Sequence, residues 1–166
     1  MPDTVTLKGN PVKVAGTEVK AGAAAPDATL SVNLKDTVTI SSFKGKKLVL
    51  AVVPSLDTPV CDLEAQRFNK EAASLGDNTV VAVVSMDLPP AQARWCGANS
   101  ATNIKTFSDH RLRDFGQKYG VYLPDLGIMC RAVFVIDETG TVKYAEYVPE
   151  IADQPNFEAA LAALKA

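Results

Sequence analysis

One segment, residues 48–62 with the sequence LVLAVVPSLDTPVCD, constrains the fold of this chain more than any other. It begins with the apolar run 48–53, which has the length and composition of a strand buried on both faces. Pro54 ends that strand, because proline cannot continue a central sheet ladder. After a short turn, apolar residues recur at helical spacing from residue 61 to about residue 75. The segment therefore predicts a strand, a turn and a helix in direct succession.

A cysteine stands in the first turn of the predicted helix. Thr58 suits the N-cap and Pro59 the first helical position, where no backbone N–H is needed. Cys61 then falls where free backbone N–H groups and the positive end of the helix dipole gather. Cysteine thiols ordinarily have a pKa of about 8.5, and at such positions the value falls to roughly 3.5–7.5. Two interpretations fit this local pattern: a nucleophilic thiolate, or a small hydrophobic residue that fills the helix end.

The spacing of Pro54, Thr58 and Cys61 resembles the active-site motif of the peroxiredoxins. The longer string VPSLDTPVCD at residues 53–62 is similar to one subfamily in particular, the bacterial thiol peroxidases, which are atypical two-cysteine peroxiredoxins. Further segments match that subfamily in order, so the resemblance covers essentially the whole chain: TLKGNP at 6–11, AQARWCG at 91–97, CRAVFVID at 130–137 and the tail at 157–165.

The resemblance implies roles for five residues. Cys61 is the peroxidatic nucleophile, and Cys96 is the resolving cysteine that joins it in a disulfide. Thr58 and Arg131 hold the thiolate and the peroxide oxygens, and Pro54 shields the thiolate from water. Without the resemblance, Thr58 would be only a helix cap, Pro54 a strand end and Cys96 a structural thiol. Arg131 could be an edge residue that reaches solvent, although a charge in an apolar run is costly unless it is paired.

Cys130 departs from the family pattern, which usually has a small apolar residue before this arginine. Neighbouring side chains on a strand point to opposite faces, so Cys130 should face away from the site if Arg131 faces it. We therefore interpret Cys130 as a small buried hydrophobic residue and not as a redox centre. His110, the only histidine, is given no catalytic role.

Cys61 and Cys96 are expected to lie apart in the reduced protein. A disulfide requires Cα atoms about 4.4–6.8 Å apart, and an activated, buried thiol is not expected so near its partner. Residues 97–101, GANSA, are small or polar and offer little packing. Local unwinding should therefore occur more readily on the Cys96 side.

Composition excludes several other classes of protein. The net charge is −2, which gives no basic surface for nucleic acid or an anionic membrane. No apolar run approaches the roughly 20 residues that span a bilayer, and the N-terminus lacks the pattern of a secretory signal. Three cysteines without an export signal indicate thiol chemistry in a reducing compartment, so a cytoplasmic location is expected. One histidine and no Cys-x-x-Cys pair do not supply a zinc site, and no cofactor is expected.

The order of the predicted elements indicates an α/β domain. Strands are expected at 48–53, 79–85 and 132–136, helices at 59–75, 90–95, 112–119 and 157–165, and hairpin strands at 5–7, 12–14 and 141–148. The resemblance implies a thioredoxin-like fold, with a central mixed sheet flanked by helices and an N-terminal β-hairpin extension at residues 1–20. Residues 1–166 are expected to form a single domain.

The sequence thus predicts a thiol-dependent peroxidase that reduces hydrogen peroxide and organic hydroperoxides through a Cys61 sulfenic acid and a Cys61–Cys96 disulfide. The resemblance implies recycling by thioredoxin, a role in antioxidant defence and a homodimer. Two alternatives remain. A protein dithiol–disulfide oxidoreductase is disfavoured because Cys61 has no partner cysteine two residues away. A redox-responsive sensor or binding protein could use the same disulfide.

Overall fold

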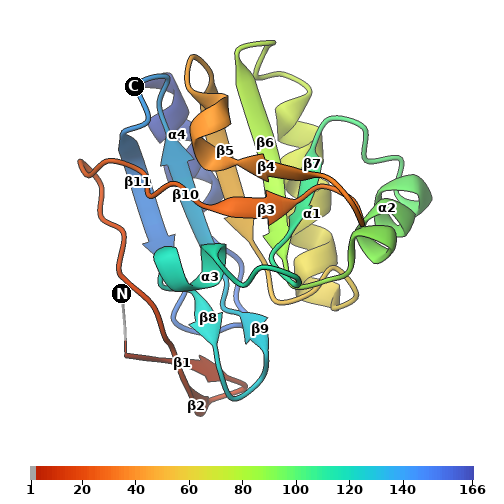
Figure 1. The fold of residues 1–166 in the computed structure, drawn as a ribbon, viewed down its shortest axis with the longest axis vertical. Coiled ribbons are helices and arrows are strands. Elements are labelled where there is room, and N and C mark those ends of the chain that lie inside the picture. Colours follow the sequence, from red (N-terminus) through yellow and green to blue (C-terminus); the bar gives the residue numbers. More distant parts are fainter. Residues whose placement is uncertain (1–2) are drawn as a thin grey trace.

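The computed structural model describes residues 3–166 and is centred on a mixed sheet (Figure 1). The strands of this sheet are β3 (Thr29–Ser31), β4 (Thr37–Thr39), β5 (Lys47–Val52), β6 (Thr79–Ser85), β7 (Lys105–Ser108), β10 (Ala132–Ile136) and β11 (Val142–Tyr147). Within the described residues they lie in the order β11-β10-β5-β6-β7-β3-β4. β5, β6 and β7 run parallel, whereas β10 pairs antiparallel with both β5 and β11. Apart from Lys47, Thr79 and Ser85 at strand ends, the residues of β5, β6 and β10 are apolar, because both faces of the sheet are covered.

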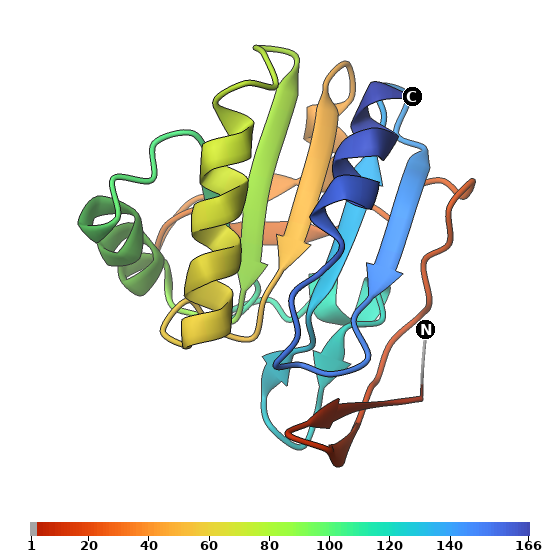
Figure 2. The same ribbon diagram turned by 180° about the vertical axis from the view of Figure 1, so that it is seen from behind.

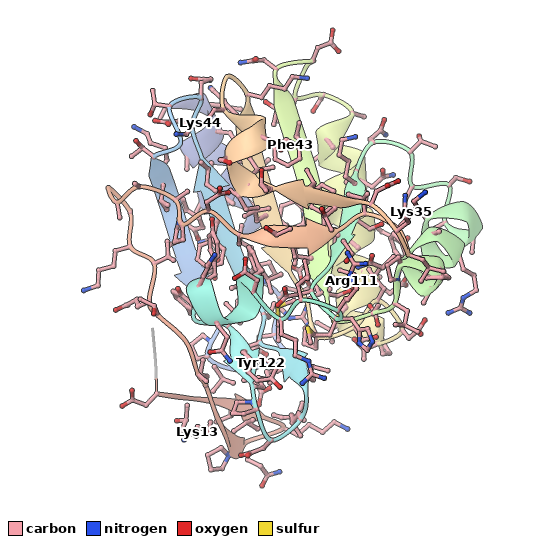
Figure 3. All side chains as sticks on the ribbon, in the orientation of Figure 1. Lys13, Lys35, Phe43, Lys44, Arg111 and Tyr122 are labelled. Carbon is pink, nitrogen blue, oxygen red and sulfur yellow. The ribbon has the colours of Figure 1, made fainter. Side chains whose placement is uncertain are left out.

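Two helices cover one face of the sheet, as Figure 2 shows: α1 (Pro59–Ala72) and α4 (Phe157–Lys165). Their apolar side chains, including Phe68 and Phe157, pack on inward-facing residues of β5 such as Val49. The opposite face carries the short elements η1 (Ile40–Phe43) and α3 (Phe115–Lys118). There the ring of Phe43, labelled in Figure 3, lies 5.8 Å from that of Phe107 between centroids. The sheet therefore separates two hydrophobic cores.

Two small hairpins lie together at one end of the molecule. β1 (Thr4–Leu7) and β2 (Asn10–Lys13) form the N-terminal hairpin, and β8 (Tyr122–Leu123) pairs with β9 (Ile128–Met129). Backbone N–H of Ala15 donates to the Tyr122 carbonyl at 2.8 Å, which joins the two hairpins. Lys13 and Tyr122 mark this end in Figure 3. The end of the molecule that carries the hairpins is also where β5 and β6 end and where α1 begins (Figure 2).

Several elements predicted from the sequence have the observed bounds, and others begin or end at different residues. The strands at 79–85 and 132–136 and the helix at 157–165 match, and the other predicted strands differ by one or two residues. Two helices differ more: α2 is Pro89–Ala98 rather than 90–95, and the helix expected at 112–119 is reduced to α3. That helix starts late because the Asp109 carboxylate holds the backbone N–H groups of residues 114–116 at 2.8–3.0 Å. α1 ends at Ala72, and turns continue it to Leu75.

No helix among residues 3–166 is long and apolar enough to cross a membrane.

Candidate active site

The thiol of Cys61 lies at the start of α1 and is completely buried. Thr58 is in the N-cap position with an extended backbone, and Pro59 begins the helix, as expected. The capping role expected for the Thr58 side chain is wrong: within the described residues it makes no capping hydrogen bond. Its hydroxyl instead donates to the Ser55 carbonyl at 2.9 Å. The turn before α1 is held by Asp87, which lies two residues after β6: its carboxylate accepts from the Ser55 hydroxyl at 2.7 Å and from the Leu56 N–H at 2.8 Å.

Arg131 joins three parts of the fold at the cysteine. It directly precedes β10, and only 1% of its surface is exposed. Nη2 donates to Cys61 Sγ at 3.2 Å, Nη1 pairs with the Glu64 carboxylate, and Nε donates to the Ile151 carbonyl at 3.0 Å. Because the guanidinium is planar, bonds at Nε and Nη1 also fix the direction of Nη2. The sequence-based alternative of an edge residue reaching solvent is therefore wrong.

Glu64 is a site residue that the sequence analysis missed. It is fully buried one turn after Cys61 on the same face of α1, and its Oε1 has no hydrogen-bond partner among residues 3–166. Burial raises the pKa of Glu64 to about 7, and the neighbouring Arg131 opposes that rise. Two signals could have revealed it: a carboxylate three residues from the cysteine on an apolar stripe, and an arginine in an apolar run that needs a counter-ion.

We expect Glu64→Gln to change how stability depends on pH. The pKa of Glu64 is higher in the folded protein than in the unfolded chain, so its contribution to stability is complete below about pH 4.5 and is lost as pH rises through 7. Glu64→Gln should therefore remove up to about 3 kcal/mol of the fall in unfolding free energy between pH 5 and pH 8. Urea unfolding of both proteins across this range measures the difference. Parallel pH profiles would contradict the prediction.

A cavity of about 310 Å³ opens beside the cysteine and is mostly apolar. Three residues with predicted roles line it: Pro54, Thr58 and Arg131. The remaining lining comes from the N-terminal hairpin, α1, β9 and the loop before α4: Leu7, Lys8, Pro59, Val60, Ile128, Ile151 and Ala152. Pro54 is buried two residues after the end of β5. The arrangement places a hydrogen-bond donor, Arg131, at the wall of an apolar space large enough for a small organic molecule.

Cys96 lies in the last turn of α2, whereas the helix predicted from the sequence ends at residue 95. It is half-buried, and burial raises the pKa of its thiol. The cysteines at 61, 96 and 130 are all free. Two contacts join α2 to the region of Cys61: Trp95 Nε1 donates to Asp62 Oδ1 of α1 at 2.7 Å, and Arg94 pairs at 3.2 Å with Asp57 in the turn before α1. These contacts oppose the local unwinding that is expected when Cys61 and Cys96 form a disulfide.

Cys130 faces the core opposite the one that contains Cys61. Burial raises the pKa of its thiol to about 12, so it stays protonated at neutral pH. His110 is exposed and lies outside the site. Within the part of the chain that the structure describes, no group of three or more His, Cys, Asp or Glu side chains could hold a metal ion.

The fold and the site together define a class of protein. A mixed sheet with the order described, a helix after its central strand β5 and a cysteine in the first turn of that helix are features of thioredoxin-like thiol proteins. The guanidinium on the cysteine sulfur adds a cation that stabilises a thiolate.

Comparison with known proteins identifies the family. Residues 20–161 match the family model described as Redoxin. The chain is 49% identical to the thiol peroxidase of Bacillus subtilis, with 98% of this chain and 96% of the relative covered, and 47% identical to that of Streptococcus pneumoniae, with 98% and 99% covered. The crystal structure of a peroxiredoxin-like protein from Aquifex aeolicus is 43% identical and superposes with a TM-score of 0.92, with 99% of this chain and 97% of that chain covered.

The chain therefore belongs to the thiol peroxidase family of the peroxiredoxins, and it is a thiol-dependent peroxidase. The family and the thioredoxin-like fold predicted from the sequence are both confirmed.

Proposed function

We propose that Cys61 is the nucleophile that reduces hydroperoxides. Its thiolate attacks the terminal peroxide oxygen, the O–O bond breaks, and the remaining oxygen leaves with a proton as water or an alcohol. Cys61 becomes a sulfenic acid, the reversible first step of thiol oxidation. The observation that carries this proposal is the 3.2 Å hydrogen bond from Arg131 Nη2 to Cys61 Sγ, since a buried cation favours the thiolate and the developing charge.

The other predicted residues have supporting roles in this proposal. Pro54 keeps water from the thiolate at the end of β5. Thr58 is exposed beside the cavity, so its hydroxyl can exchange the Ser55 carbonyl for a peroxide oxygen. The apolar lining of the cavity supports organic hydroperoxides as substrates in addition to hydrogen peroxide. Residues 1–166 act as one domain, and the family supports a homodimer in the cytoplasm.

Cys96 completes the cycle as the resolving cysteine. Its thiolate attacks the Cys61 sulfenic sulfur, hydroxide leaves with a proton as water, and an intrachain disulfide forms. Thioredoxin then returns two electrons to this disulfide. The position of Cys96 in the last turn of α2 supports a resolving role, because Cys96 is only half-buried and the exposed residues 97–98 follow it, so this helix end unwinds at a lower cost than the buried end that carries Cys61.

One assay tests the function and separates the alternatives. Peroxide consumption coupled to thioredoxin and its reductase should continue over many turnovers, and peptide mapping should recover a Cys61–Cys96 disulfide after one equivalent of peroxide. A sensor would oxidise once and cycle negligibly. A dithiol–disulfide oxidoreductase would reduce protein disulfides in the absence of peroxide. Either of these two results would overturn the proposal.

The hydrogen bond between Trp95 and Asp62 should slow disulfide formation, because it holds the end of α2 that must unwind for Cys96 to reach Cys61. Hydrogen bonds to charged groups are worth about 1.5–3 kcal/mol. Trp95→Phe, which keeps an aromatic ring but loses the donor, should therefore form the disulfide roughly tenfold faster after one equivalent of peroxide. Quenched samples analysed by mass spectrometry measure the rate.

The control for this prediction is Arg94→Gln, which removes the neighbouring exposed ion pair with Asp57. Exposed pairs contribute little, so its rate should stay within about twofold of wild type. An equal acceleration in both variants, or none in Trp95→Phe, would mean that the Trp95–Asp62 bond does not limit resolution.

A further inference from the structure

The loop between β11 and α4, residues 148–156, meets the active site from two directions. Its Ile151 carbonyl accepts from Arg131 Nε at 3.0 Å. Three residues later, Gln154 Nε2 donates to the Val60 carbonyl at 3.0 Å, in the turn of α1 that carries Cys61. Figure 2 shows the loop passing below α4, on the side of the molecule where the N-terminal hairpin lies. The loop therefore contacts both the arginine and the helix start that flank the thiol.

The same loop is attached to the N-terminal hairpin. Thr6 of β1 makes two backbone hydrogen bonds with it, both at 2.8 Å: its N–H donates to the Pro149 carbonyl, and its carbonyl accepts from the Ile151 N–H. The Glu150 side chain adds a further connection. Its Oε1 accepts from the Gly9 N–H at 2.8 Å and from the Thr6 hydroxyl at 3.1 Å.

Glu150 also shapes the loop itself. Its Oε2 accepts from the Ala152 N–H at 2.8 Å, on the far side of Ile151. The hydrogen bonds from Ala152 and Gly9 lower the pKa of Glu150, so the carboxylate is ionised at neutral pH. One carboxylate thus joins the hairpin turn to the residues on both sides of the carbonyl that binds Arg131.

The position of that carbonyl matters because it is one of the three hydrogen-bond partners that orient the buried Arg131 guanidinium. Nη1 is held by Glu64 and Nη2 is directed at the Cys61 sulfur, so Nε is the second anchor of a rigid plane. If Ile151 moves, the guanidinium can rotate about the Glu64 contact and Nη2 leaves the sulfur. The Ile151 side chain is buried in the core, but Pro149 and residues 152–154 on either side of it are exposed, so hydrogen bonds such as those of Glu150 hold the flanks of the loop.

We propose that Glu150 is a positioning residue for the peroxidase reaction: it attaches the N-terminal hairpin to the loop whose Ile151 carbonyl orients Arg131 on the Cys61 thiol. This inference rests on the function proposed for Cys61 and Arg131. It gives the hairpin an effect on the chemistry in addition to its place in the cavity wall.

The test measures Cys61 directly, in full-length protein with Cys96→Ser and Cys130→Ser so that a single thiol reacts. Glu150→Ala should slow both iodoacetamide alkylation at pH 7 and the single-turnover reaction with peroxide by about fivefold. Glu150→Gln should recover to within about twofold, because its amide oxygen still accepts from Gly9. Thr6→Val, which removes only one hydrogen bond to Glu150, should slow both reactions by about twofold and serves if Glu150→Ala does not fold.

Two controls separate positioning from general stability. Asp27→Ala removes a carboxylate that likewise accepts from a backbone N–H and a hydroxyl, both of Ser41 at 2.9 Å, away from Cys61. It should lower the melting temperature without changing either rate. In the Arg131→Met background, Glu150→Ala should have no further effect on either rate, because the residue acts through Arg131.

Wild-type rates in Glu150→Ala, or equal slowing by Asp27→Ala, or additive effects with Arg131→Met, would overturn the inference. Alkylation needs no peroxide, so it decides the role of Glu150 even if the wild-type protein does not react with peroxide. A wild-type protein that does not react with peroxide would instead refute the proposed function.

Discussion

Cys61→Ser is expected to reduce peroxide turnover coupled to thioredoxin by at least about 10³-fold, to the background rate. A serine hydroxyl at this position cannot supply a thiolate or form a sulfenic acid, and no other cysteine is placed to substitute for Cys61. Cys130 lies in the opposite core with a pKa raised to about 12, and burial also raises the pKa of Cys96. Steady-state oxidation of NADPH through thioredoxin reductase measures the turnover.

Cys130→Ser is the matched control, since it makes the same change in a buried cysteine outside the site. It should keep turnover within about twofold of wild type and lose roughly 1–3 kcal/mol of stability from burying a hydroxyl. Wild-type-like turnover in Cys61→Ser would remove the basis of the proposed mechanism. Loss of turnover in a folded Cys130→Ser protein would instead mean that Cys130 takes part in the cycle.

Arg131→Met should slow the reaction of Cys61 with peroxide by about 10²–10³-fold, which is the usual effect of removing one oriented donor from a site of developing charge. The substitution removes the hydrogen bond to the sulfur and the buried positive charge together. Alkylation of Cys61 at neutral pH should slow as well, because the sulfur loses both a hydrogen-bond donor and the neighbouring positive charge. Stopped-flow mixing with peroxide and a timed alkylation series measure the two rates.

Loss of Arg131 also leaves Glu64 buried without its partner, which could unfold the protein for a reason unrelated to catalysis. The double variant Glu64→Gln/Arg131→Met removes that unpaired carboxylate. It should recover most of the stability lost in Arg131→Met but none of the peroxide rate. Recovery of the rate along with the stability, or an unchanged rate in Arg131→Met, would show that the guanidinium does not act on the thiol.

The strand, turn and helix around Cys61 were predictable because their causes are local. An apolar run ended by Pro54 gives a buried strand, and Thr58 followed by Pro59 gives a helix start in any context where the strand forms. The opposite orientation of Cys130 and Arg131 follows from the two-residue period of an extended chain, and the two hydrophobic cores agree with it. The predicted bounds of the strands 79–85 and 132–136 and of the helix 157–165 were also correct, because these elements too follow from local apolar patterns.

Other parts of the site depend on residues far apart in the sequence. Glu64 meets Arg131 across 67 positions, and Trp95 meets Asp62 across 33. The Thr58 hydroxyl could have capped α1, but the turn held by Asp87 places the Ser55 carbonyl within its reach. Asp109 similarly delays α3 by binding the N–H groups of its first residues. Each outcome is a competition between hydrogen-bond partners that only the packed chain brings together.

By itself the sequence determined that a cysteine begins a helix behind a buried strand, and its motif pointed to the family, because both depend on neighbouring residues. Only the tertiary structure decided what surrounds the sulfur. It brought the Arg131 guanidinium to the Cys61 sulfur, with Glu64 and the Ile151 carbonyl as its other hydrogen-bond partners. It also joined the loop that carries Ile151 to the N-terminal hairpin through Glu150. A charge in a core must be paired, but which of many polar groups pairs with it is set by the packing of distant segments.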